Sequence, residues 1–367
     1  MDRRKFIVTS VAGAAGLLLG KQLHAARKSK KNVKNYSVVI LGDTHYDKAP
    51  ATIYHSNYDD PNEKSNAVHR KEFERNGEMW ADRCPRLIKR AQQLADDTTR
   101  LIYQTGDLVQ GDCGRGDVHK QMLKDAIQDI AGGFPSHIPF VTIEGNHDVR
   151  GTQAAEVYHE FLPAFVSEEL GKSISKTTFS FTIGDDAYIA VDFNHPDNQE
   201  LDKLLKETQG ARHTFILSHG TLFPADNSYP TWYFLGGRNP EKRRKEREYF
   251  RRELAKRNAI CLCGHTHCTE LLDWYCPEGR ITQFVMNSVW ANPAMSEYKE
   301  LVSGPEMYGK FKNADKESLY ADIIPGLKRF SIAYCAGFFK MKVEPNRIAV
   351  DFYGGDSIEP TKTFVLR

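Results

Sequence analysis

The segment YSVVILGDTH, residues 36–45, decides the fold because an apolar run ends directly in a polar Gly-Asp-x-His group. Continuous apolar runs of this length are typical of strands that are buried on both faces. Two helical stripes, Cys84 to Leu94 and Leu123 to Ile130, indicate helices between such runs. This alternation predicts an α/β sheet that is largely parallel in its first half. Five further apolar runs of the same kind follow, at residues 100–105, 138–143, 187–192, 214–218 and 259–263.

Antiparallel pairing is indicated in the second half of the chain. Residues 179–183 and 187–192 flank a Gly-Asp-Asp turn, which predicts a hairpin. Residues 339–343 and 348–352 flank a second turn and predict another hairpin near the C-terminus. Because parallel and antiparallel strands are combined, we expect two packed mixed sheets.

Other local signals are weaker. Residues 48–77 and 221–242 are polar and carry few helix or strand signals, so we expect two long loops. Asp117 is the expected N-cap of the helix that includes residues 123–130. Cys261 and Cys263 lie two positions apart on a strand, and we expect them to act as small core residues rather than as zinc ligands.

Polar side chains that can bind metals follow five of the apolar runs. Each motif alone is common, but the ordered set of five is specific. In an open α/β sheet, ligands bind outside the carboxyl ends of the strands, so these groups are expected to meet in one crevice. A glycine precedes four of the groups and is expected to allow a tight exit from the strand. The groups are Gly42-Asp43-Thr44-His45, Gly106-Asp107, Gly145-Asn146-His147-Asp148, Ser218-His219-Gly220 and Gly264-His265-Thr266-His267.

This ordered set resembles the signature of the calcineurin-like metallophosphoesterase superfamily. That signature reads Asp-x-His, Gly-Asp, Gly-Asn-His-Asp or Glu, His, and Gly-His-x-His. Every required ligand has a counterpart in this chain, between residues 36 and 290. The resemblance implies a four-layer α/β/β/α sandwich of two mixed sheets flanked by helices. It also implies a hydrolase that acts on phosphoric ester bonds.

The resemblance further implies a dinuclear metal centre in which Asp107 bridges the two ions. Imidazole and carboxylate ligands suit Mn, Fe or Zn better than Ca or Mg. A hydroxide that bridges the two ions would attack the ester, and the net positive charge of the loaded site would attract an anionic small-molecule substrate. One ion would be held by Asp43, His45, Asp107 and His267, and the other by Asp107, Asn146, His219 and His265.

Three further residues are candidates for the chemistry beside the metals. By the same resemblance, His147 would stabilise the transition state or protonate the leaving group. Either Asp148 or a backbone carbonyl would orient His147. Arg150 either contacts a phosphate oxygen or forms a surface salt bridge. His195 follows the run at residues 187–192 and could border the substrate.

Differences from two well-known branches of the family indicate which subgroup the chain resembles. Serine/threonine protein phosphatases carry Gly-Asp-x-Val-Asp-Arg-Gly, whereas this chain has Gln110 and Gly111 in place of the second Asp and the Arg. Purple acid phosphatases need a tyrosine ligand at the position of Gln110 and lack the histidine of Asp-x-His. The form found here is most similar to cyclic-nucleotide and related bacterial phosphodiesterases, which favours diester hydrolysis.

The first residues have the pattern of an export signal. Arg3-Arg4-x-Phe6 opens an apolar run of 15 residues, too short to span a bilayer, and resembles a twin-arginine signal. We therefore expect a periplasmic or extracellular protein that uses the twin-arginine machinery and keeps no stable membrane span. The predicted division is a signal peptide over residues 1–26, a basic linker over 27–35, a catalytic core over 36–292, and C-terminal strands over 293–367 that complete the sandwich.

Composition excludes several classes of protein. The 367 residues are 40% hydrophobic and 27% charged, which argues against a disordered chain or a multi-span membrane protein. The net charge is +2, but residues 1–34 carry nine Lys or Arg against one Asp, so the remaining chain has a net charge of −6. No basic domain is present, and we expect no nucleic-acid partner. A non-catalytic phosphate-binding or ligand-binding protein and a nuclease remain as alternatives.

Overall fold

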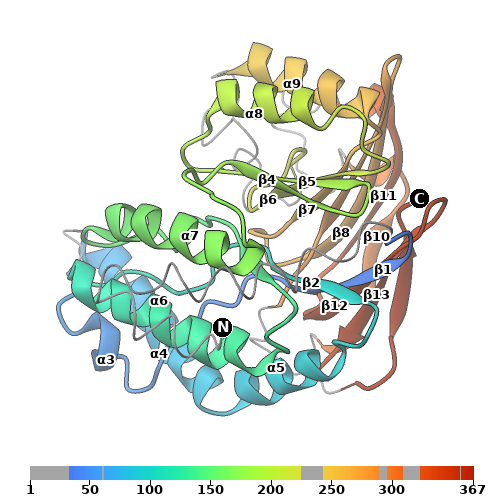
Figure 1. Ribbon diagram of the computed structural model, residues 1–367. Coiled ribbons are helices and arrows are strands. Elements are labelled where there is room, and N and C mark those ends of the chain that lie inside the picture. Colours follow the sequence, from blue (N-terminus) through green and yellow to red (C-terminus); the bar gives the residue numbers. More distant parts are fainter. Residues whose placement is uncertain (1–32, 60–61, 225–242, 289–295, 309–322, 356) are drawn as a thin grey trace.

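The computed structural model describes residues 33–59, 62–224, 243–288, 296–308, 323–355 and 357–367 (Figure 1). The predicted signal peptide, the linker up to residue 32 and the second polar loop from residue 225 to 242 lie outside the described residues. Within the described ranges, no helix combines the length and the apolar character that a membrane span requires.

The first sheet has six strands in the order β14-β13-β12-β1-β2-β3 (Figure 1). Three of them are parallel, namely β1 (Tyr36–Leu41), β2 (Thr99–Gln104) and β3 (Phe140–Thr142). The other edge of β1 continues in antiparallel order with β12 (Gly337–Val343), β13 (Ile348–Gly354) and β14 (Lys362–Val365). The predicted hairpin near the C-terminus is therefore confirmed, and it extends the sheet that begins with β1.

The second sheet has eight strands in the order β10-β11-β8-β9-β7-β6-β5-β4. Strands β5, β6, β7 and β9 are parallel, and the remaining pairs are antiparallel, including the predicted hairpin of β4 and β5. The bounds are β4 (Phe179–Ile183), β5 (Asp186–Val191), β6 (Thr214–Ser218), β7 (Ile260–Cys263), β8 (Thr269–Cys276), β9 (Gly279–Val285), β10 (Glu300–Ser303) and β11 (Leu327–Ala333).

Helices cover the outer face of each sheet. Figure 1 shows α5, α6 and α7 beside the first sheet, and α8 and α9 on the second. In the part of the chain that the structure describes, two short 3₁₀ helices lie at Ala131–Gly133 and Ile324–Gly326. The α-helices are α3 (Thr52–His55), α4 (Glu63–Ala81), α5 (Arg83–Gln93), α6 (Gly116–Ile130), α7 (Ala154–Leu170), α8 (Asn198–Glu207) and α9 (Arg244–Lys256).

Side-chain alternation in the second sheet shows how the layers pack. In β6, Phe215 and Leu217 belong to the large core that also includes the first sheet, whereas Ile216 packs in the smaller core with α8 and α9. Cys261 and Cys263 of β7 lie buried in that smaller core, as expected of small apolar residues. Both faces of the sheet are therefore covered. The predicted four-layer α/β/β/α sandwich of two mixed sheets is confirmed.

Two local predictions are wrong. Residues 48–77 are not one long loop, because α3 and most of α4 lie within them. The buried side chains of α4, such as Phe73 and Trp80, are too sparse to form a readable apolar stripe. Asn62 is the N-cap of α4 and accepts hydrogen bonds from the backbone N–H of residues 64 and 65. This residue type was a signal in the sequence for the start of the helix. Asp117 is not an N-cap, because α6 begins at Gly116 and the Asp117 carboxylate pairs with Arg115 instead.

Candidate metal centre

Seven side chains meet where strands of both sheets end. Their backbone positions follow the carboxyl ends of β1, β2 and β3 in the first sheet and of β6 and β7 in the second. The two sheets therefore place their polar strand ends against each other, as the rule for α/β sheets predicts. The seven residues are Asp43, His45, Asp107, Asn146, His219, His265 and His267.

The first group of ligand atoms surrounds one point. His45 Nε2 lies 3.0 Å from His267 Nε2 and 3.6 Å from Asp107 Oδ2. His267 Nε2 lies 3.3 Å from Asp43 Oδ2. Ligand atoms that bind one transition-metal ion at about 2.1 Å are separated by about 3.0–3.5 Å. The spacing of these four side chains therefore fits a shared cation.

The second group of ligand atoms shares Asp107 with the first. His219 Nε2 lies 3.2 Å from Asp107 Oδ2, 3.2 Å from Asn146 Oδ1 and 3.2 Å from His265 Nδ1. The same oxygen of Asp107 thus faces an imidazole of each group. This is the position that a ligand bridging two ions requires.

Hydrogen bonds on the outer side of the rings fix which nitrogen points inward. His219 Nδ1 donates to the carbonyl oxygen of Thr105 at 2.9 Å, and His45 Nδ1 donates to Gln110 Oε1 at 3.1 Å. In both rings the Nε2 lone pair is therefore directed into the centre, which is the arrangement of metal-bound histidines. Gln110 was noted in the sequence only as a departure from the protein phosphatases. No pattern in the sequence revealed its contact with His45.

The local charges favour the metal-binding forms of the two carboxylates, His45 and His265, and the protonated form of His219. Burial alone would raise the pKa of Asp43 and Asp107, but the imidazole charge of His219 lowers both, and that of Asp107 falls well below its usual range. Burial lowers the pKa of His45 to about 4 and that of His265 to about 3, so both rings are neutral at neutral pH. Against the effect of burial, the Asp107 and Asp43 carboxylates raise the pKa of His219 to about 9. A cation bound here would take the place of that proton.

The backbone is strained at these positions. Among the described residues, eight that are not glycine have a positive φ, and four of these are candidate ligands. Such a conformation costs on the order of 1–3 kcal/mol per residue and is concentrated at functional sites. The four are His45 (φ 41°), Asp107 (φ 52°), His265 (φ 73°) and His267 (φ 49°).

The motif glycines are needed chiefly for space. A Cβ atom on Gly145 would lie 2.2 Å from Asp107 Oδ1, and one on Gly264 would lie 2.2 Å from Asp43 Oδ1. Of the four motif glycines only Gly106 has a positive φ, +94°. The expectation of a tight turn thus holds for Gly106, whereas the other glycines allow a neighbouring group to approach closely.

His147 lies directly beside the Asp107 carboxylate. Its backbone N–H donates to Asp107 Oδ1 at 2.7 Å, and its Nδ1 donates to the carbonyl oxygen of Gln110 at 2.9 Å. A backbone carbonyl therefore orients the ring. Asp148 instead accepts hydrogen bonds from the backbone N–H of Gly145 and Val109, at 2.9 and 3.1 Å, and holds the loop in place. Burial and the charge of a neighbouring guanidinium lower the pKa of His147 well below its usual value.

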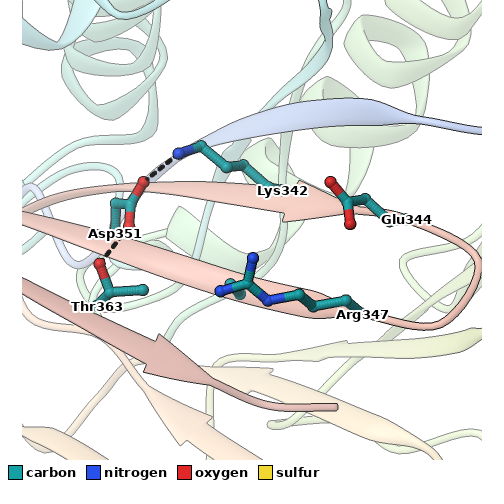
Figure 2. Close-up of a pocket in the computed structure, with 6 residues that line it drawn as sticks. Lys342, Glu344, Arg347, Asp351 and Thr363 are labelled. Carbon is teal, nitrogen blue, oxygen red and sulfur yellow. Dashed lines mark hydrogen bonds and ion pairs between the residues drawn. The ribbon is translucent and has the colours of Figure 1, made fainter.

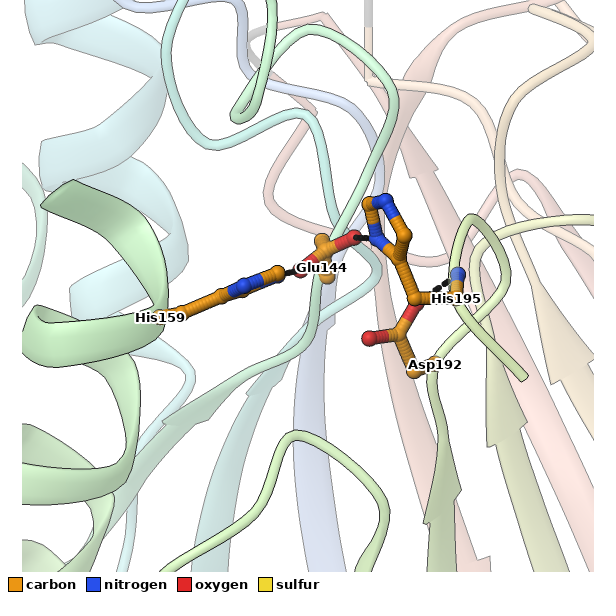
Figure 3. Close-up of side chains that lie close together, drawn as sticks. All are labelled: Glu144, His159, Asp192 and His195. Atoms are coloured by element: carbon orange, nitrogen blue, oxygen red, sulfur yellow. Dashed lines mark hydrogen bonds and ion pairs between the residues drawn. The ribbon is translucent and has the colours of Figure 1, made fainter. Parts of the chain in front are cut away.

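Arg150 and His195 are held by other partners. The Arg150 guanidinium is ion-paired with the buried Asp112 and lies 3.6 Å from Glu72, so the structure shows the salt-bridge alternative. His195 Nδ1 lies 3.3 Å from Glu144 Oε1. His195 belongs to another group of potential metal ligands, made of Glu144, His159, Asp192 and His195, for which the sequence offered no motif. Figure 3 shows these four side chains.

A hollow on the first sheet is unrelated to this centre. Its cavity volume is about 170 Å³, and Asp351 in its wall is ion-paired to Lys342 at 2.7 Å and accepts a hydrogen bond from Thr363 at 2.6 Å (Figure 2). Val343, next to this hollow, pairs with Tyr36 at the start of β1, whereas the candidate ligands follow the end of β1. The hollow therefore lies at the opposite end of that strand.

A comparison with family models assigns the chain to a known family. The family model described as calcineurin-like phosphoesterase matches residues 36–269, and the chain belongs to this family. The clustered side chains of this chain include groups that could hold metal ions. A comparison with curated proteins gives no match.

Solved structures share the fold at low sequence identity. A dimetal phosphatase from Danio rerio is 11% identical with a TM-score of 0.51, and the match covers 90% of this chain and 99% of that chain. The purple acid phosphatase PPD1 from yellow lupin (Lupinus luteus) seeds is 12% identical with a TM-score of 0.50. That match covers 91% of this chain and 54% of the lupin chain, so this chain spans about half the length of the plant protein.

Proposed function

We propose that this chain is a metal-dependent hydrolase of a small phosphate diester and that it acts outside the cytoplasm. The observation that carries the proposed activity is the position of Asp107 Oδ2. This oxygen lies 3.2 Å from His219 Nε2 and 3.6 Å from His45 Nε2, between two sets of ligand atoms. Buried carboxylates and inward-facing imidazoles suit Mn, Fe or Zn.

In this proposal the chain supplies geometry and proton transfer. When bound, two cations would acidify a water molecule between them and neutralise the phosphoryl oxygens. Asp107 fixes the distance between the two ligand sets, because the His147 backbone N–H holds one of its oxygens and leaves the other for the centre. One cation is assigned to Asp43, His45, Asp107 and His267, and the other to Asp107, Asn146, His219 and His265.

His147 is the proposed general acid. Because its Nδ1 donates to the Gln110 carbonyl, Nε2 is the ring atom that is left to face a substrate. The lowered pKa makes the protonated ring a stronger acid than an ordinary histidine, and a neighbouring anion favours its protonated form. A bound phosphate ester provides that anion, and the proton then passes to the departing oxygen.

Two features support a diester rather than a monoester. A monoester carries two negative charges and gains more from an additional guanidinium than a diester with one charge. The charge of Arg150 is already balanced by Asp112 and Glu72. At Gly111, where protein phosphatases carry an arginine, a Cβ atom would lie 2.1 Å from the carbonyl oxygen of His147, so there is no room for a side chain.

The activity is tested with matched aryl esters. Protein with measured metal content is assayed with bis(4-nitrophenyl) phosphate and with 4-nitrophenyl phosphate. We expect kcat/KM to be at least about tenfold higher for the diester, which corresponds to about 1.4 kcal/mol. A preference for the monoester would contradict the diester assignment. If protein that holds two metal ions hydrolyses neither ester, the non-catalytic alternative is favoured.

The export part of the proposal is supported by the Arg3-Arg4-x-Phe6 pattern, which lies outside the described residues. We expect the double substitution Arg3→Lys and Arg4→Lys to retain the protein in the cytoplasm of a bacterial host with a twin-arginine system. Cell fractionation and immunoblotting measure the distribution. The matched control is Arg27→Lys, which leaves the arginine pair intact. Equal export of the double variant and the wild type would contradict the assignment.

A further inference from the structure

A second cluster of metal-binding residue types lies apart from the candidate metal centre. It contains Glu144, His159, Asp192 and His195, and one ligand atom from each lies within 4.8 Å of the others. Glu144 follows β3, His159 lies on α7, and the other two follow β5. Figure 3 shows the four side chains directed toward one another from these three elements. The cluster thus connects the first sheet and its helix to the second sheet.

The two imidazoles approach one carboxylate from different sides. His159 Nε2 lies 2.7 Å from Glu144 Oε2, and His195 Nδ1 lies 3.3 Å from Glu144 Oε1. The rings are nearly perpendicular, at 87°, with centroids 5.2 Å apart. A nitrogen of each ring is therefore directed toward the same small volume beside Glu144.

The cluster contains two buried carboxylates. Glu144 and Asp192 are 1% exposed, and neither has a lysine or arginine among its described hydrogen-bond or ion-pair partners. The two histidines can pair with Glu144, at 2.7 and 3.3 Å, but two protonated rings are then needed, and the buried charge of Asp192 is costly unless it too is paired or coordinates a metal. One divalent cation would neutralise both carboxylates while both imidazoles stayed neutral.

We propose that Glu144, His159, Asp192 and His195 bind a third divalent cation, separate from the dinuclear pair. Two imidazole nitrogens and two carboxylate oxygens form a set typical of Zn²⁺. The His195 side chain is 57% exposed, which gives an ion a route from solvent. Because four protein groups would surround the ion, its role is structural.

The proposed ion would steady the neighbouring loop of the candidate metal centre. Asn194, between the ligands that follow β5, donates to Glu144 Oε1 at 2.9 Å and to the Gly145 carbonyl oxygen at 3.1 Å. Gly145 precedes the candidate ligand Asn146. Occupation of the third site would therefore fix the start of the segment that delivers Asn146 and His147.

Metal content of the full-length protein tests this proposal. Protein freed of metal by chelation is reloaded with Zn²⁺, desalted and measured by elemental analysis. We expect three zinc ions per wild-type chain and two in the double variant His159→Gln and His195→Gln. The glutamines keep a hydrogen-bond donor for Glu144 but remove the imidazole nitrogens. The matched control is His137→Ala, at an exposed histidine outside both clusters, which should keep three ions. Equal zinc content in the double variant and the wild type would overturn the proposal.

A second measurement separates this site from the proposed hydrolase. In the Asp107→Asn background, which disables the bridging position, we expect Zn²⁺ to raise Tm. Addition of His159→Gln and His195→Gln should reduce that rise, because only the zinc bound at the candidate centre would then remain. Since neither measurement uses hydrolysis, the third site can fail while the hydrolase stands, and the reverse also holds. A zinc-dependent rise in Tm of equal size in the Asp107→Asn variant and in the triple variant would contradict the third site.

Discussion

The two clusters of histidines and carboxylates in this protein are built in opposite ways. In the candidate metal centre, imidazole nitrogens face each other, at 3.0 Å between His45 and His267 and 3.2 Å between His219 and His265. In the cluster around Glu144, each imidazole faces a carboxylate oxygen of Glu144, whereas His219 and His267 of the centre face both a carboxylate oxygen and another imidazole. Four ligands of the first cluster have a positive φ, and none of the four residues of the second does.

Because of this difference, we expect the two clusters to depend on a bound metal ion to different degrees. Two ring nitrogens that face each other can share one proton, and a metal cation can bind both lone pairs in place of that proton. An imidazole that faces a carboxylate already has a hydrogen bond, and a metal must compete with that bond. We therefore expect the metal pair to dominate activity and the Glu144 cluster to affect metal content and local stability.

The largest effect is expected for Asp107→Asn, which changes the one oxygen that both ligand sets share. Loss of its charge should reduce ester hydrolysis by at least about 10³-fold, or about 4 kcal/mol, without unfolding the protein. Steady-state kinetics and circular dichroism measure the two properties. Hydrolysis at the wild-type rate in a folded variant would exclude the bridging role of Asp107. It would also contradict the expectation that the metal pair affects activity more than the Glu144 cluster does.

His147→Ala is expected to have the next largest effect. This side chain belongs to neither ligand set in our assignment, so both ions should remain while turnover falls by about 10²–10⁴-fold. The loss should be greatest for esters with poor leaving groups, because these need a proton most. Elemental analysis and a leaving-group series test both statements. If the variant loses a metal ion, His147 is a ligand rather than the acid.

Gln110→Ala is expected to have the smallest effect. It removes the acceptor for His45 Nδ1 but keeps the backbone carbonyl that orients His147. Affinity for one ion should fall by about 10–100-fold, as for other partners of metal-bound histidines. Competition with a chelator measures it, and Gln110→Glu, which keeps an acceptor, is the matched control. Unchanged affinity in Gln110→Ala would show that His45 does not depend on this contact.

The sequence alone was sufficient where residue type and strand position coincide. The bounds of β1 and β6 agree with their apolar runs, because strands that are buried on both faces leave a continuous apolar signal. The candidate ligands were identified because motifs mark the ends of such strands. The structure then brings all seven together from both sheets.

Other features have no local signature. The polar helix α4 buries too few side chains to show a period. The ring of His147 is oriented by the carbonyl oxygen of Gln110, and a backbone atom is the same in every residue. Glu144, His159 and His195 are separated in the sequence and meet only because α7 and the end of β5 pack beside β3. Such contacts depend on tertiary packing and become visible only in the folded chain.

The most important part of the proposal is that one oxygen of Asp107 binds both metal ions. Anomalous diffraction from crystals of the Mn²⁺-loaded protein tests it most directly. We expect two peaks about 3.5–4 Å apart, with the Asp107 carboxylate between them. A single peak at Asp107, or two peaks too far apart to share its carboxylate, would contradict it.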